Sequence, residues 1–148
     1  MEITTDIAII GGGLTGSLMA LAGAKNGFSV CIIDAVGENT QKDPDFDGRS
    51  YAMAMASVRM LKALGVWADL ELGAQPIMDI KVTDGAVGAH PSPFFLHFDR
   101  HGLDEGPMGH MIEDRHLRSV LQSRLRDNEN ITYLGGKRVE DQAVSYTT

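Results

Sequence analysis

The chain has 148 residues, of which 43% are hydrophobic, and it carries a formal net charge of −7. This length and composition are typical of a globular domain with a buried core, and they exclude an intrinsically disordered chain. An acidic chain without basic patches is also a poor partner for nucleic acid. The single cysteine, Cys31, excludes an internal disulfide and a cysteine-based zinc site.

The apolar runs are too short for a transmembrane helix, because glycines and charged residues interrupt them. The N-terminus lacks the positively charged start of a signal peptide, since Glu2 and Asp6 precede the first apolar run. We therefore expect a cytoplasmic protein. Peripheral attachment to the inner membrane stays an open alternative.

A strand, a glycine turn, a helix and a second strand follow one another near the N-terminus. The first strand is expected over Ile3–Ile10, with its apolar run at Ile7–Ile10, and the helix over Leu14–Asn26. The second strand is expected over Ser29–Asp34 and ends on an acid. This order is that of a dinucleotide-binding βαβ unit.

Each position of the glycine turn has a physical task. Gly11 permits the tight strand-to-helix turn, Gly13 lets a pyrophosphate approach the backbone, and Gly16 lets the helix pack closely on the strand. The helix N-terminus at Leu14 and Thr15 offers free N–H groups and a partial positive charge to the phosphates. An ordinary βαβ unit, whose glycines only form a turn, is the structural alternative.

The acid at the end of the second strand completes the pattern. Asp34 lies 23 residues after Gly11. There its carboxylate can accept hydrogen bonds from ribose hydroxyls, and it would repel a 2′-phosphate. The sequence therefore favours FAD or NAD over NADP.

The pattern of apolar and polar residues changes after the second strand. The region 77–112 contains alternating apolar and polar residues, which indicates an antiparallel layer separate from the parallel sheet. The later region returns to a helix and strand of the parallel core. The expected elements are a loop over 36–48, helices over 50–64 and 66–72, strands over 77–84, 94–98 and 109–112, a turn over 85–93, a helix capped by Asp114 and extending to Leu125, and strands over 131–134 and 138–144.

One arginine stands out beyond the glycine turn. Arg49 follows Asp47-Gly48 and precedes the expected helix. Such an arginine is often a solvated cation. Beside a dinucleotide site, its planar guanidinium can instead pair with phosphate or ribose oxygens.

Three segments together resemble a known family. They are GGGLTG with Asp34, DGRSYAMAMASVRMLKALGVW over 47–67, and GHMIEDRHLRSVL over 109–121. They are similar to the start of the ubiquinone-biosynthesis hydroxylases, FAD-dependent aromatic monooxygenases of the p-hydroxybenzoate hydroxylase superfamily. The resemblance spans about 6–139, and its middle segment is more specific than the glycine turn.

The resemblance implies an α/β fold, with a Rossmann-like FAD-binding βαβ unit and parallel sheet plus part of an antiparallel substrate-domain sheet. It implies an FAD-binding domain from 1–76 and 113–148, with 77–112 in the substrate-binding sheet. Longer family members carry later Asp-Gly and Gly-Asp motifs that have no counterpart here. The resemblance thus implies an N-terminal portion, incomplete at its C-terminal end, and we expect catalysis only from a longer protein.

The resemblance also assigns residues to the cofactor. Gly11, Gly13 and Gly16, with Leu14 and Thr15, would hold the FAD pyrophosphate. Asp34 would bind the adenosine ribose, Arg49 would lie along the FAD, Arg115 would sit at the cofactor site, and the Val139 backbone would meet the adenine.

The implied reaction depends on the cofactor. In the family, NAD(P)H reduces the flavin, and a C4a-hydroperoxyflavin formed with O₂ hydroxylates a phenol, here expected to be polyprenylated. We therefore expect no catalytic acid or base. The five histidines, including His101, show no metal-binding spacing, so we expect no metal. A non-catalytic dinucleotide-binding module and another FAD oxidoreductase, such as an amine oxidase or halogenase, stay as alternatives, as does membership of a biosynthetic complex.

Overall fold

A computed structural model of the chain describes residues 2–37, 40, 48–85, 88, 90, 94–99 and 106–146. Much of the predicted loop over 36–48, much of the predicted turn over 85–93, and His101 lie outside these residues. Within them, the elements are β1 (Ile7–Ile10), α1 (Leu14–Lys25), β2 (Val30–Asp34), β3 (Ser50–Ala54), α3 (Met55–Ala63), α4 (Trp67–Leu70), the 3₁₀ helix η1 (Glu71–Gly73), β4 (Gln75–Ile77), β5 (Asp79–Thr83), β6 (Phe95–Asp99), β7 (Gly109–Glu113), α5 (Asp114–Arg126) and β8 (Ile131–Gly135).

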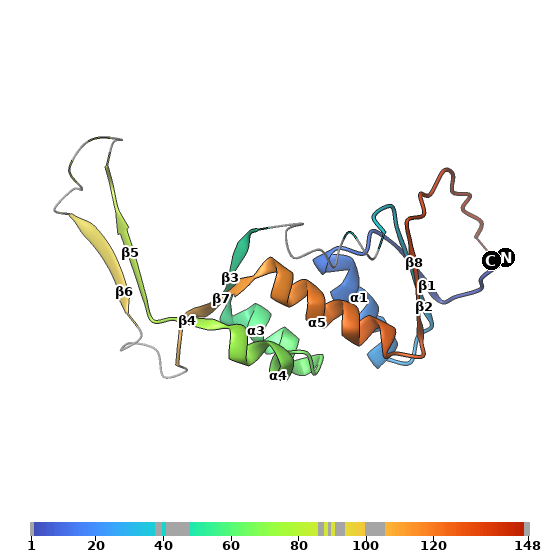
Figure 1. Cartoon of the computed structure of the whole chain (residues 1–148), viewed down its shortest axis with the longest axis horizontal. Coiled ribbons are helices and arrows are strands. Elements are labelled where there is room, and N and C mark those ends of the chain that lie inside the picture. The colour runs from blue at the N-terminus through green and yellow to red at the C-terminus, as the bar shows by residue number, and fades with distance from the viewer. Residues whose placement is uncertain are drawn as a thin grey trace.

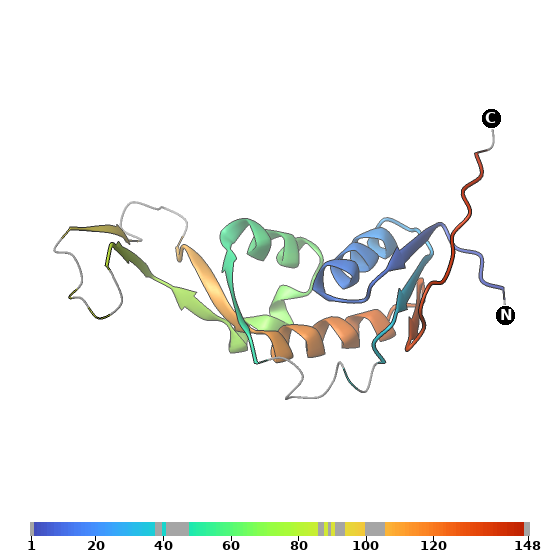
Figure 2. The ribbon, with the colours of Figure 1, turned by 90° about the horizontal axis from the view of Figure 1, so that it is seen from above.

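The predicted parallel sheet is confirmed. Its strand order is β1-β2-β8, with Ile7 opposite Val30 and Val30 opposite Ile131. Helices α1 and α5 pack side by side against it (Figures 1 and 2). Helix α1 connects the parallel strands β1 and β2, so it runs antiparallel to them, whereas α5 leads from β7 of another sheet into β8. The N-terminus of α1 therefore lies at the carboxyl edge of the sheet, where β1 turns into α1.

Small residues allow α1 to lie close to the sheet. Ala20 is fully buried, and Ala24 is nearly so. A side chain placed at Gly23 would come within 3.1 Å of both Ile7 Cδ1 and Val30 Cγ2. The close approach of helix and strand thus depends on the absence of larger side chains, and it brings the start of α1 directly against the turn that follows β1.

Among the described residues, one hydrophobic core joins the helices to the parallel sheet and to β7. From α5 it takes Leu117, Leu121 and Leu125, each at most 3% exposed and spaced four residues apart. This spacing places them on one face of the helix. The other buried hydrophobic members of the cluster come from α1, β2, α3, the α3–α4 junction, α4 and β7: Ala20, Leu21, Ala24, Val30, Ile32, Val58, Leu61, Val66, Trp67, Leu70 and Ile112.

The predicted helix over 50–64 is wrong in its first part. Residues Ser50–Ala54 form β3, which pairs antiparallel with β7, and the helix begins only at Met55. Tyr51 and Met53 are half-buried while their neighbours are exposed, which is the period of a strand. The apolar spacing also fitted a helix, and the partner strand lies about sixty residues away in sequence. Pairing with that distant strand decided the outcome.

Two other predicted strands differ from the structure. The strand expected over 77–84 is divided at Met78, because β4 pairs with β7 whereas β5 pairs with β6. The strand expected over 138–144 is wrong, since 137–146 form no helix or strand. That segment is mostly exposed and joins neither sheet. The remaining expected helices and strands form within a few residues of their predicted bounds.

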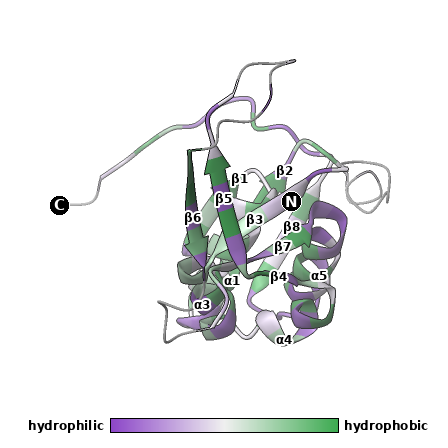
Figure 3. Ribbon diagram, turned by 90° about the vertical axis from the view of Figure 1, so that its left-hand side faces the viewer, coloured by the Kyte–Doolittle hydropathy of each residue, from purple (hydrophilic) through white to green (hydrophobic). Residues whose placement is uncertain are grey.

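The middle of the chain is antiparallel, as predicted. β7 lies between β3 and β4, and β5 pairs with β6 in a ribbon that extends from the rest of the molecule (Figure 1). The β3-β7-β4 sheet takes strands from both sides of the predicted boundary at residue 77. All ten ribbon residues are exposed, and hydrophobic and hydrophilic residues alternate along β5 (Figure 3). Among the described residues, no helix has the length and apolar character needed to cross a membrane.

Candidate dinucleotide-binding site

The glycine turn after β1 has the geometry that its residues predict. Gly11 has φ of 102°, a left-handed conformation that side-chain-bearing residues rarely adopt, and its N–H donates to the Ile33 carbonyl over 2.9 Å. A Cβ at Gly16 would overlap the Gly11 carbonyl oxygen and lie 3.1 Å from its carbon. The first turn of α1 can therefore sit against the glycine turn only because position 16 has no side chain.

The N-terminus of α1 has no counter-charge among its own residues. Gly13 is the N-cap and supplies no capping side chain, and the first turn contains no acid. The first N–H groups of a helix have no partner within the helix, and the helix dipole adds partial positive charge there. Open space lies beside Gly13, since a Cβ there would meet nothing within 4 Å. These features of Gly13, Leu14 and Thr15 fit a diphosphate.

Asp34 lies beside the glycine turn, at the end of β2. Its carboxylate is buried and accepts hydrogen bonds from the Gly12 N–H and, over 2.7 Å, from the Val36 N–H. These donors hold the carboxylate at the carboxyl edge of the sheet. Because a carboxylate has roughly four acceptor positions, Asp34 can also accept bonds from ribose hydroxyls.

Tyr133 is a neighbour of this site that sequence reasoning missed. It lies on β8, opposite Ile32 of β2. A Cβ at Gly12 would press against the Tyr133 hydroxyl and lie 2.8 Å from Tyr133 Cε2 and 2.9 Å from Asp34 Oδ2. The middle glycine is therefore enclosed by these two side chains. The apolar pattern of 131–134 predicted the strand, but no local signal indicated its contact with the turn.

The two predicted site arginines are brought close along the backbone. The Asp114 N–H donates to the Arg49 carbonyl over 2.9 Å, which continues the β3–β7 pairing by one step. Arg115 follows in the first turn of α5, where its Nε lies 2.6 Å from Glu113 Oε2. The Arg115 guanidinium lowers the pKa of the exposed Glu113 carboxyl, through a hydrogen bond and through its charge.

The predicted helix cap has a different role. Asp114 is the first residue of α5, and the N-cap is Glu113, which makes no side-chain capping bond. The Asp114 carboxylate instead accepts bonds from Tyr51 and Arg118. The cap expectation is therefore wrong, although the helix starts where it was predicted.

Val139 follows β8 in sequence, in a segment that begins beside the end of β2. The Lys137 N–H donates to the Asp34 carbonyl over 2.9 Å, which brings the chain after β8 back beside the acid. Val139 is half-buried two residues later. Its contact with an adenine stays a prediction.

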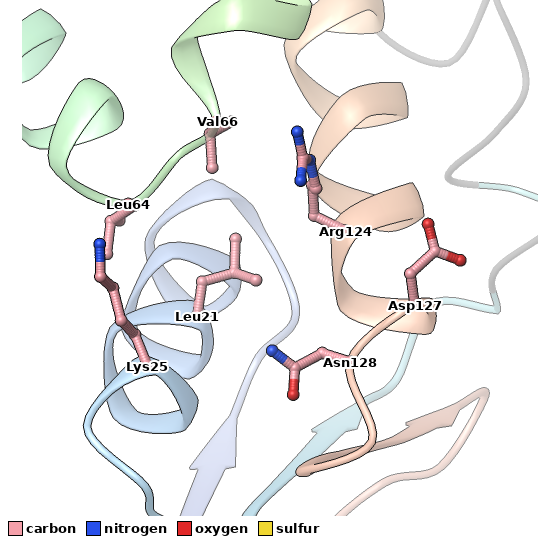
Figure 4. Close-up of a pocket in the computed structure, with 7 residues that line it drawn as sticks. All are labelled: Leu21, Lys25, Leu64, Val66, Arg124, Asp127 and Asn128. Carbon is pink, nitrogen blue, oxygen red and sulfur yellow. The ribbon is translucent and has the colours of Figure 1, made fainter.

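A cavity of about 290 Å³ lies at the opposite end of the helices (Figure 4). Leu21, Leu64 and Val66 supply its apolar side chains, and its polar residues include two cations whose partners belong to the protein. Lys25 donates to the Ala63 carbonyl at the end of α3, and Arg124 lies 2.7 Å from Asp69. Lys25 thus binds the end of a helix, and Arg124 forms an ion pair with Asp69. Because both cations already have partners within the protein, this cavity is no candidate for the phosphates of a dinucleotide.

A second cavity, of about 240 Å³, adjoins the glycine turn. Its walls come from α1, β3, α3 and α5, and Leu14 belongs to both the cavity and the start of α1. The lining is largely apolar: Leu14, Leu18, Tyr51, Ala52, Met53, Ser57, Met60, Leu61 and Leu117. Within the described part of the chain, no three His, Cys, Asp or Glu residues gather in a group suited to a metal ion.

The fold and this site define a dinucleotide-binding domain of the α/β class. Comparison with known proteins agrees: residues 4–136 match the family described as FAD binding domain. Ubiquinone hydroxylase UbiL of Rhodospirillum rubrum is 42% identical over 120 residues, which are 81% of this chain and 27% of that protein. The 3-demethoxyubiquinol 3-hydroxylase of Escherichia coli K12 is 32% identical over 130 residues, 86% of this chain and 32% of that protein.

The chain belongs to the FAD binding domain family, and over most of its length it is similar to the two ubiquinone-related hydroxylases. It spans about 30% of the length of the curated relatives it matches. Among solved structures, a probable FAD-dependent monooxygenase of Pseudomonas aeruginosa, pqsL, superposes with a TM-score of 0.72 at 17% identity. The match covers 93% of this chain and 34% of that one, and it establishes the shared fold.

Proposed function

We propose that this chain is the N-terminal FAD-binding part of a flavin-dependent aromatic-ring monooxygenase that hydroxylates a polyprenylated phenol in ubiquinone biosynthesis. The observation that carries the proposal is the glycine turn with Asp34 beside it, together with an α1 N-terminus that has no acid or capping side chain. The relatives named ubiquinone hydroxylase and 3-demethoxyubiquinol 3-hydroxylase support the pathway and the substrate class.

In this proposal, the described residues bind and orient the cofactor. The backbone of Gly11, Gly13 and Gly16, with the N–H groups of Leu14 and Thr15, holds the pyrophosphate. Asp34 binds the ribose, and Arg49 and Arg115 lie along the cofactor. The backbone of Val139 meets the adenine. Bound FAD would supply the redox chemistry, with NAD(P)H as electron donor and O₂ as co-substrate.

The division of the chain belongs to the same proposal. Residues 1–76 and 113–148 would form the FAD-binding domain, and 77–112 would contribute to the substrate-binding sheet. The exposed apolar residues of β5 and β6 support this, because a sheet face of Ile80, Leu96 and Phe98 is suited to further protein or to an apolar substrate. We further propose a cytoplasmic protein that associates peripherally with the inner membrane or with a biosynthetic complex, since a polyprenylated substrate resides in lipid.

Equilibrium binding tests the cofactor assignment. The longest natural polypeptide that carries these residues is stripped of cofactor and titrated with FAD, NAD and NADP, with FAD fluorescence and calorimetry as readouts. FAD should bind at least tenfold more tightly than NAD. A carboxylate beside the ribose disfavours a 2′-phosphate, so NADP should be the weakest of the three at this site. Tighter binding of NAD than of FAD would overturn the proposal.

A substitution tests the ribose contact. Asp34→Ala should weaken FAD binding by about tenfold or more, because a hydrogen bond to a charged group contributes about 1.5–3 kcal/mol. The circular dichroism spectrum should stay that of a folded protein. Asp127→Ala, an acid at the far end of α5, is the matched control and should bind FAD normally. Unchanged FAD affinity in Asp34→Ala would remove Asp34 from the site.

A further inference from the structure

A buried carboxylate lies at the first residue of α5. Asp114 is 1% exposed, and its Oδ1 accepts hydrogen bonds from the Tyr51 hydroxyl over 2.9 Å and from Arg118 Nη2 over 3.0 Å. Its Oδ2 accepts a third bond, from Arg118 Nε over 3.0 Å. The Arg118 side chain is itself only 11% exposed. Both oxygens are thus held by donors from β3 and from the next turn of α5.

Such a network is a poor source of stability by itself. Moving an ion pair out of water carries a desolvation cost that its mutual attraction roughly offsets, and well-packed apolar side chains often serve equally well. What a fully hydrogen-bonded buried pair does provide is a defined geometry, because each donor and acceptor has a required direction.

Asp114 holds the chain at the start of β3 through two residues, Arg49 and Tyr51. Its N–H donates to the Arg49 carbonyl, and its carboxylate accepts from Tyr51 two residues later. The β3–β7 register continues from this point, with Ser50 opposite Glu113. Arg115 is the next residue of α5. One side chain therefore connects the segment that carries Arg49 to the helical turn that carries Arg115.

We propose that Asp114 is a positioning residue of the FAD site, which acts with Tyr51 and Arg118 to set the backbone from which Arg49 and Arg115 reach the cofactor. This inference rests on the proposed function, in which both arginines contact FAD. Asp114 itself is buried, and in this role it touches no substrate or cofactor. Its effect on FAD is transmitted through the placement of β3.

The test uses Tyr51→Phe, because removing Asp114 would leave Arg118 buried without its counter-charge and could unfold the protein. Tyr51→Phe deletes one hydroxyl and keeps the ring. In the longest natural polypeptide, stripped of cofactor, it should weaken FAD binding about fivefold, because only part of the energy of the lost hydrogen bond to a charged group affects the cofactor site. The thermal midpoint of the cofactor-free protein should fall by only about 3–9 °C, as expected for one lost hydrogen bond, and the protein should stay folded.

A double-mutant cycle separates positioning from general damage. In an Arg49→Ala background, Tyr51→Phe should weaken FAD binding less than it does in the wild type, because part of the effect of the hydroxyl passes through Arg49. Tyr146→Phe, with a side chain that is 89% exposed, is the matched control and should match the wild type. Additive losses, or unchanged FAD affinity in Tyr51→Phe, would overturn the positioning role. Failure of the wild type to bind FAD would overturn the proposed function itself.

Discussion

Gly12→Ala is a change at the middle of the glycine turn that the contacts around Tyr133 allow us to quantify. An ideal Cβ at position 12 lies 2.8 Å from Tyr133 Cε2 and 2.9 Å from Asp34 Oδ2, and it presses on the Tyr133 hydroxyl. Carbon atoms are at their optimum near 3.5–4.0 Å, so the ring must move by about 0.7 Å or more. Overpacking of this kind costs about 1–3 kcal/mol.

We expect this loss in the free energy of unfolding. For a chain of this size it corresponds to a fall of about 3–9 °C in the melting temperature, measured by circular dichroism without cofactor. Tyr133→Val removes the ring, so Gly12→Ala should cost at least about 1 kcal/mol less in that background.

Gly13→Ala is the matched control for Gly12→Ala. A Cβ there meets nothing within 4 Å, and φ is −67°, so the loss should stay near the roughly 0.5–1 kcal/mol by which glycine exceeds alanine at an N-cap. FAD affinity should nevertheless fall, because the methyl group occupies the predicted phosphate position. Equal costs of Gly12→Ala with and without Tyr133, or equal losses for the two glycines, would refute the reasoning from these contacts.

Burial, followed by the charge of Lys62, lowers the pKa of His110 from its ordinary value of 6.5. As the pH falls, His110 therefore becomes protonated in the unfolded chain before it does in the folded one. The free energy of unfolding should consequently decrease as the pH drops below about 6.5. Urea unfolding at pH 7.5 and 5.5 should show a smaller difference in His110→Phe than in the wild type, and an equal difference would contradict this cause. Leu121→Ala should cost about 2–5 kcal/mol in a urea titration, because Leu121 is 1% exposed in the core, and a loss below 1 kcal/mol would count against that packing. Gly109→Ala would drive a Cβ into the Met53 carbonyl between β7 and β3, so thermal unfolding should begin at lower temperature, whereas an unchanged melting curve would show that the strands lie further apart.

Local sequence patterns were sufficient to predict the structure where the contacting residues are close in sequence. The unit from Ile7 to Asp34 could be predicted because a buried parallel strand, a glycine turn and a helix each have a short-range signature. Gly11 and Gly16 lie five residues apart, and their contact follows from the geometry of one turn. The antiparallel character of the middle region was predictable for a similar reason, since alternation along five residues indicates a half-exposed strand.

Pairing between distant segments decided the rest. Ser50–Ala54 fits a helical pattern as well as an extended one, and β7 makes it a strand by supplying hydrogen bonds from about sixty residues away. The contact of Tyr133 with Gly12 and the bond from Tyr51 to Asp114 likewise join residues far apart in sequence. A residue's own neighbours set its propensity and its turn geometry. Which distant backbone satisfies its hydrogen bonds, and which side chain fills the space beside it, depends on the packing of the whole chain.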